Sequence, residues 1–156
     1  MKSKVFTVAL LVVMLAQTAF AGSQCKTFVA EQRDNLITNG CTSPIGFCAG
    51  GTFKGNHGFR GTSFFSAISF DPILSDVLGR LVVPGVSTYT TDDGTLTISD
   101  VSVFDTPCGT FAGIGRVTSG TGRFAGATGD VFTTGHVAPD GLSFTTDVTA
   151  EICLAN

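Results

Sequence analysis

The side chains that most often carry out chemistry are sparse and scattered in this sequence. His57 and His136 each stand without a nucleophile or an acid at a motif spacing, and no Gly-x-Ser-x-Gly sequence occurs. Glu31 and Asp34 could act as a pair of acids, but residues three apart on a strand point to opposite faces. This spacing argues against general acid–base catalysis by the pair, and the sequence leaves the catalytic residues unknown.

Four side chains are candidates for binding a small molecule. Each lies on a segment that we expect to form a strand in the wall of a β-barrel, for the reasons given below. Tyr89, the only tyrosine, could direct its hydroxyl into the lumen. Arg33 and Arg60 could point inward and orient a polar group of a ligand, or could lie on the outer, solvated side. Phe65 is one of 14 phenylalanines, whose rings could fill the lumen or line an apolar pocket there. We expect the following rings to lie mainly in the core: Phe53, Phe59, Phe64, Phe65, Phe70, Phe111, Phe124, Phe132 and Phe144.

The five cysteines predict disulfide bonds, because an export signal would bring the chain into an oxidising compartment. Cys41 and Cys48 bracket the turn Thr-Ser-Pro-Ile-Gly-Phe and form the first predicted pair. Cys108 with Cys153 is the second, which leaves Cys25 unpaired near the N-terminus. No Cys-x2-Cys pair occurs and the histidines are isolated, so we predict no metal site.

The segment from Ser119 to Gly129 is rich in glycine, so a phosphate-binding loop has to be considered. Its Gly-x-Gly-x-x-x-Gly spacing departs from the dinucleotide fingerprint by one residue, and no Lys-Ser or Lys-Thr pair follows. Residues 130–137 predict a strand, whereas a phosphate loop leads into a helix N-terminus. We interpret the segment as a tight connection whose glycines allow positive φ angles, with Phe124 as its apolar anchor. We therefore predict no cofactor.

The N-terminus has the three parts of a secretory signal peptide. Lys2 and Lys4 precede an apolar run over residues 5–16, and the small-x-small sequence at 19–21 is typical of a cleavage site. The run is shorter than the roughly 20 apolar residues that span a membrane. We predict a signal peptide over residues 1–21 and a secreted protein, extracellular or periplasmic, without a membrane span after cleavage.

The composition of the remaining chain favours an acidic all-β domain. Loss of Lys2 and Lys4 would reduce the nine basic residues to seven, against twelve acidic ones, for a net charge of about −5. A chain of this charge without a basic run repels phosphate backbones, so nucleic acid is not an expected partner. Threonine, valine and phenylalanine favour strands, and the frequent glycines favour turns and bulges.

Strand and turn signals alternate along residues 22–156, which we interpret as a single domain. Closing the sheet hides the edges of its strands best, so we predict a closed antiparallel β-barrel of about eight strands, with a β-sandwich as the alternative. Residues 71–79 predict one short helical insertion, since Asp71 and Pro72 could begin a helix and Gly79 could end it. We expect strands at 25–37, 49–54, 59–70, 86–91, 95–104, 110–118, 130–137 and 142–153.

The segment Gly120–Gly129 resembles one that recurs in the allene oxide cyclase-like barrel superfamily, which includes the dirigent proteins and many secreted bacterial proteins. The Cys41–Cys48 loop and the closing residues Thr149–Cys153 resemble the secreted bacterial members in particular. The resemblance implies an eight-stranded antiparallel barrel with an apolar central cavity. Characterised members guide a reactive intermediate through cyclisation or radical coupling without a cofactor. No catalytic residue of theirs can be assigned to a position of this chain.

Three functions are compatible with these observations. The first is binding of a small apolar molecule in the lumen, which the phenylalanines and the low charge favour. The second is a cofactor-free isomerase or cyclase, which needs the same cavity and an inward acid, base or tyrosine. The third is a structural or surface interaction domain with a packed lumen, which predicts an exposed patch or a homo-oligomer instead of a pocket.

Overall fold

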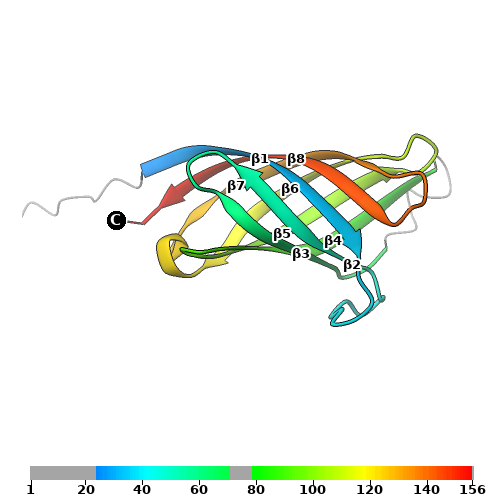
Figure 1. Cartoon of the computed structure of the whole chain (residues 1–156), viewed down its shortest axis with the longest axis horizontal. Helices are drawn as coiled ribbons and strands as arrows, with labels where there is room; N and C mark the ends of the chain where they lie inside the picture. The colour runs from blue at the N-terminus through cyan, green and yellow to red at the C-terminus, as the bar shows by residue number, and fades with distance from the viewer. Residues whose placement is uncertain (1–23, 71–78, 156) are drawn as a thin grey trace, which may run out of the picture.

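The computed structural model describes residues 24–70 and 79–155, which form a closed barrel of antiparallel strands (Figure 1). Each strand pairs with the next, and the last pairs with the first, so the sheet has no open edge. The predicted closed barrel is confirmed, and the sandwich alternative is wrong. The elements are β1 Gln24–Leu36, β2 Cys48–Gly55, β3 Arg60–Ala67, β4 Arg80–Thr91, β5 Gly94–Asp105, β6 Thr110–Gly120, the 3-10 turn η1 Gly122–Phe124, β7 Thr128–Val137 and β8 Ser143–Leu154.

The predicted strands agree with the observed ones except at β4, which begins six residues earlier than the predicted start at Val86. Pro84 and Gly85, which precede the predicted start, both lie within β4 and pair with β5. The Pro84 carbonyl accepts a hydrogen bond from the backbone N–H of Ile68, which is the first residue after β3. This edge of Pro84 therefore faces the chain just beyond the end of β3. In the β3–β4 register Ile68 lies opposite Pro84, which has no N–H to complete the second bond of this pair, and β3 ends one residue earlier, at Ala67.

Two sequence predictions fall wholly or largely outside the described residues. The signal peptide of residues 1–21 lies there, and so does the helical insertion of residues 71–79 except for Gly79. Within residues 24–70 and 79–155, no helix is both long enough and apolar enough to cross a membrane.

The half of the lumen nearest the C-terminus is packed solid with apolar side chains. Alternate residues of each strand point inward, and those at this end are aromatic or branched, so they fill the narrow interior. The largest fully buried members are Phe28, Phe59, Phe124, Leu96, Ile98 and Ile152.

The glycine-rich connection between β6 and β7 lies at this end of the barrel and is tight and anchored by Phe124, as the sequence predicted. Phe124 is fully buried and meets the Phe59 ring edge-on at 6.2 Å between centroids. Gly122 and Gly126 have φ angles of 57° and 69°, which only glycine adopts readily. Arg123 covers the same end, with its guanidinium 4.7 Å from the centre of the Phe124 ring.

The disulfide pairing is partly as predicted and partly different. Cys41–Cys48 is present as expected, but Cys153 bonds to Cys25 and not to Cys108. The prediction failed because closure of the barrel sets β1 beside β8, in a register that places Cys25 directly opposite Cys153. Cys108 lies in the β5–β6 loop and is the exposed free cysteine of the described chain.

Candidate functional site

Tyr89 divides the lumen into a packed half and an open half. Its ring packs against the core, edge-on to Phe53 at 5.1 Å and tilted against Phe59 at 5.7 Å between centroids. Its hydroxyl crosses from β4 to the far wall and donates a 2.9 Å hydrogen bond to Gln32 Oε1 on β1. The ring therefore ends the packed core on one side and forms the floor of a cavity on the other.

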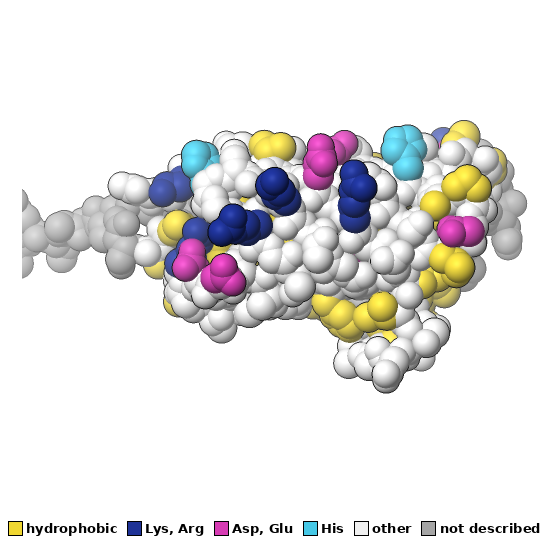
Figure 2. All heavy atoms as spheres, in the orientation of Figure 1, with side chains coloured by type: hydrophobic (Ala, Val, Ile, Leu, Met, Phe, Trp, Pro, Cys, Tyr) yellow, Lys and Arg dark blue, Asp and Glu magenta, His cyan; other side chains and the backbone are white. Residues whose placement is uncertain are grey.

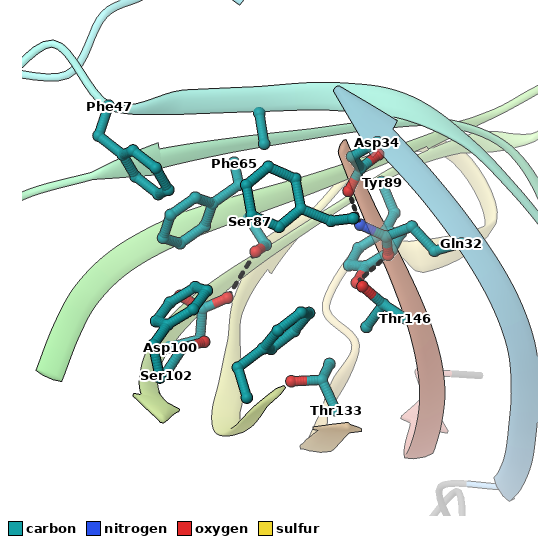
Figure 3. A pocket seen from close by; sticks show the side chains of 14 residues that line it. Gln32, Asp34, Phe47, Phe65, Ser87, Tyr89, Asp100, Ser102, Thr133 and Thr146 are labelled. Carbon is teal, nitrogen blue, oxygen red and sulfur yellow. Dashed lines mark hydrogen bonds between the residues drawn. The ribbon is translucent and has the colours of Figure 1, made fainter. Parts of the chain in front are cut away.

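Above this floor lies a small cavity of about 60 Å³ (Figure 3). Next to it lies a larger hollow of about 510 Å³, the mouth, and Phe47, Phe104 and Phe144 line both spaces. The mouth lies at the end of the barrel opposite to the C-terminus, where hydrophobic side chains also gather on the face drawn in Figure 2. In the described part of the chain, a largely apolar mouth therefore adjoins the cavity above the Tyr89 floor.

Five phenylalanines form the apolar wall of the cavity: Phe47, Phe65, Phe104, Phe111 and Phe144. They contact one another edge-on or stacked, with Phe104 and Phe111 stacked at 5.0 Å between centroids. Gly85 and Gly135 make room for two of the rings, because a Cβ at either position would overlap Phe65 or Phe111 respectively. The wall is therefore preformed by backbone positions that lack side chains.

One polar group of the cavity is Asp34 on β1, whose two carboxyl oxygens both accept hydrogen bonds. Ser63 donates to Oδ1 at 2.5 Å, and the Gln32 amide donates to Oδ2. Burial raises the pKa of Asp34 above its ordinary value, and these two hydrogen bonds partly offset the rise. Gln32 thus connects Asp34 to the Tyr89 hydroxyl, and the network is satisfied from within the protein.

Asp100 on β5 is different, because only one of its oxygens has a partner among the described residues. Ser87 donates to Oδ2 at 2.5 Å, whereas the buried Oδ1 accepts no hydrogen bond. Burial raises the pKa of Asp100 to about 6, with a smaller opposing effect of the Ser87 hydrogen bond. Figure 3 shows Asp100 and Ser87 together on one side of the cavity.

The Tyr89 hydroxyl stays protonated in this environment. Burial raises its pKa above the ordinary value, and the nearby charges of Asp100 and Asp34 raise it further. The site therefore combines a neutral hydrogen-bond donor with a carboxyl group that can exchange a proton near neutral pH.

Of the four predicted ligand-binding residues, the structure brings two to the cavity. Tyr89 and Phe65 line it, but Arg33 and Arg60 are exposed on the outer face of β1 and β3. Both arginines alternate with inward residues, so the strand period directs them into solvent. Phe132 was expected in the core and is instead 51% exposed on the outer face. Phe70, also expected there, is 41% exposed beyond the end of β3.

Sequence reasoning missed the polar residues Gln32, Asp34, Ser87 and Asp100 that line the cavity. Two of them could have been found from the sequence. Asp34 lies an even number of residues from the buried Phe28, and Asp100 lies an even number of residues from the buried Leu96. Counting in steps of two along those strands would have placed both carboxyl groups inside. Among residues 24–70 and 79–155, no three His, Cys, Asp or Glu side chains gather closely enough to hold a metal ion.

Comparison with known proteins does not assign a family or a function to the chain. No model of a known protein family matches the chain, and no curated protein matches its sequence. Function is therefore argued below from the geometry of the cavity.

Proposed function

We propose that this protein is a secreted barrel that binds a small, mainly apolar molecule in the open half of its lumen. The observation that carries the proposal is the cavity above Tyr89, which five phenylalanines line and which adjoins the mouth. A concave, mainly aromatic site with a few convergent polar groups is the usual form of a small-molecule site. The resemblance to the allene oxide cyclase-like barrels supports the same reading, and the two disulfides suit an oxidising compartment.

The test is binding of a neutral fluorescent probe, N-phenyl-1-naphthylamine, to the mature protein. We expect saturable binding, which Ala49→Leu weakens at least tenfold because the larger side chain fills the cavity that Ala49 lines. Ala112→Leu is the matched control, since Ala112 is exposed on the outer face of β6. Equal binding by both variants, or no saturable binding by the wild type, would refute the proposal. Native mass spectrometry of protein from its own culture medium would then identify a natural ligand.

The same cavity supports a cofactor-free isomerase or cyclase as the enzymatic form of this proposal. Its specific support is Asp100, which lines the cavity and whose pKa of about 6 suits proton exchange near neutral pH. Turnover of a bound molecule that is unchanged by Asp100→Asn and Tyr89→Phe would remove this form and leave the binding function intact.

A second candidate function is self-association through the outer face, and a row of exposed apolar residues favours it. Val101, Ile114, Phe132 and Val29 lie in one line across neighbouring strands, joined through Thr149 in the strand register. Their side chains are 40% to 57% exposed. Exposed apolar residues that are contiguous often mark an interface.

The occupant that fits this row is a second copy of the chain. Ile114 pairs with Phe132, and Arg116 with Asp130, across β6 and β7. A two-fold axis parallel to these strands would set Ile114 against Phe132 of the partner, and Arg116 against the partner's Asp130. Light scattering should give a dimer mass that Phe132→Ser halves and Leu142→Ser, exposed elsewhere, leaves unchanged. A monomeric wild type at high concentration would exclude this candidate.

A further inference from the structure

The two carboxyl groups that line the cavity, Asp34 and Asp100, differ in how many of their oxygens accept a hydrogen bond. Asp34 accepts hydrogen bonds on both oxygens from Gln32 and Ser63. Asp100 accepts one from Ser87, and its other oxygen is buried without a donor from the described residues. A buried carboxylate oxygen without a donor is costly, so a donor group that enters the cavity beside Asp100 would be favoured there.

The surroundings of Asp100 select the charge of that group. The titratable side chains that line the cavity are Asp34, Tyr89 and Asp100, and no lysine, arginine or histidine is among the described lining residues. At the rim, Asp105 forms an ion pair with Arg80 at 3.8 Å, so this cation already has a partner. The cavity therefore carries negative charge that no basic side chain inside it balances.

The aromatic wall favours a cation as well. The faces of phenylalanine rings carry partial negative charge and attract organic cations, most strongly where water is excluded. Five such rings surround the cavity that contains Asp100. A carboxylate combined with an aromatic cage is the chemistry that recognises an ammonium group, whereas it repels carboxylates and phosphates.

We propose that the lumen selects small organic amines in their protonated form, with the ammonium group beside the Asp100 carboxylate and the apolar body among the phenylalanines. This rests on the proposed function, since it names the class of molecule that the cavity binds. The volume of about 60 Å³ above Tyr89 accommodates the ammonium group and the carbons next to it. The rest of the molecule extends past Phe47, Phe104 and Phe144 into the mouth.

Three probes of nearly the same shape test the charge selection: 2-phenylethylamine as cation, 2-phenylethanol as neutral donor and phenylacetate as anion. Calorimetry with the mature protein at pH 7.5 should give at least tenfold tighter binding of the amine than of the alcohol, and none of the anion. The difference between amine and alcohol needs no variant, so it does not depend on the folding of a mutant. Equal affinity for amine and alcohol would overturn the proposal.

The Asp100→Asn variant tests the position of the ammonium group. It should lower the affinity for the amine at least tenfold and change that for the alcohol less than threefold. Asp147→Asn removes the same charge from the exposed outer face of β8 and should change neither. An unchanged amine affinity in Asp100→Asn would overturn the assignment.

The same experiments separate this proposal from the proposed function. If the neutral probe N-phenyl-1-naphthylamine binds and the amine has no advantage, the cavity is a binding site without charge selection. If neither the neutral probe nor any of the three small probes binds, the proposed function itself fails. If the amine binds tightly only to wild type and to Asp147→Asn, both proposals are supported.

Discussion

The Tyr89 side chain reaches across the barrel, and its hydroxyl donates a 2.9 Å hydrogen bond to Gln32 Oε1 on the opposite wall. Gln32 uses its amide group in turn to reach Asp34, so one side chain connects a phenol to a carboxyl group inside a narrow barrel. This chain of bonds fixes the height at which the packed core ends and the cavity begins. The depth of the site therefore depends on a polar contact as well as on apolar packing.

Replacing Tyr89 by Phe should lower the free energy of unfolding by about 1–2 kcal/mol, because Gln32 Oε1 loses a buried donor while the ring stays in place. Replacing Tyr89 by Ala should cost about 3–5 kcal/mol, because the ring also packs on Phe53 and Phe59. Urea unfolding of the two variants measures the difference. Equal losses would mean that the hydroxyl, and not the ring, provides the stability.

The sequence predicts the walls of this barrel better than it predicts the site. Local signals such as turn glycines and the alternation of residues 142–153 place strands well, because each depends on a few neighbouring residues. The site depends on which face of each strand is inward and on which strands meet across the lumen. Cys25 and Cys153 illustrate the limit, since only closure of the sheet makes them neighbours. Asp100 was missed because an acid in a strand can face the lumen or the solvent. Only its spacing from a buried residue of the same strand tells the two cases apart.

Asp100 should make the protein less stable as the pH rises from about 4 to about 6. Its pKa is 3.8 ordinarily and about 6 in the folded protein, so over this range the unfolded chain releases the proton first. The unfolded state then binds fewer protons than the folded state, and stability falls with rising pH, by roughly 3 kcal/mol for this shift. The raised pKa of Asp34 acts in the same direction.

Asp100→Asn should therefore be more stable than the wild type at pH 7.5 and nearly equal to it at pH 4. The variant keeps the contribution of Asp34, so its pH dependence is reduced and not abolished. Urea unfolding at the two pH values measures this, with Asp147→Asn as a control that follows the wild type. A variant that is less stable than the wild type at pH 7.5 would contradict the burial penalty assigned to Asp100.

The two disulfides should contribute unequally to stability. Cys25–Cys153 links residues 128 apart in sequence, whereas Cys41–Cys48 links residues only 7 apart. The chain-entropy model gives roughly 5 kcal/mol for the long loop and roughly 2.5 kcal/mol for the short one. Paired Cys→Ser variants, made with Cys108 also replaced by Ser to prevent exchange, should lose stability in this order by urea unfolding. A larger loss for the Cys41–Cys48 pair would show that the unfolded chain does not set the cost.

Cys108 should react with thiol reagents in the folded protein, but slowly at neutral pH. It is exposed, yet a hydrogen bond to Asp105 and the charge of Asp105 raise the pKa of its thiol. The thiolate is the reactive form, so labelling should accelerate with rising pH, and Asp105→Asn should speed it at pH 7. Labelling with a chromogenic disulfide reagent measures both rates. Asp130→Asn, a change on the outer face far along β7, should leave the rate as it is.

Gly85→Ala should shrink the cavity more than it destabilises the fold. A Cβ at this position would overlap the Phe65 ring, so the ring must move, and the space open to it is the cavity that it lines. We expect a stability loss of about 1–3 kcal/mol, typical of overpacking, together with at least tenfold weaker binding of N-phenyl-1-naphthylamine. Gly50→Ala is the matched control, because its nearest neighbour would be the Ile37 side chain at 3.3 Å and it does not line the cavity. Undiminished probe binding by Gly85→Ala would place the bound molecule outside the space beside Phe65.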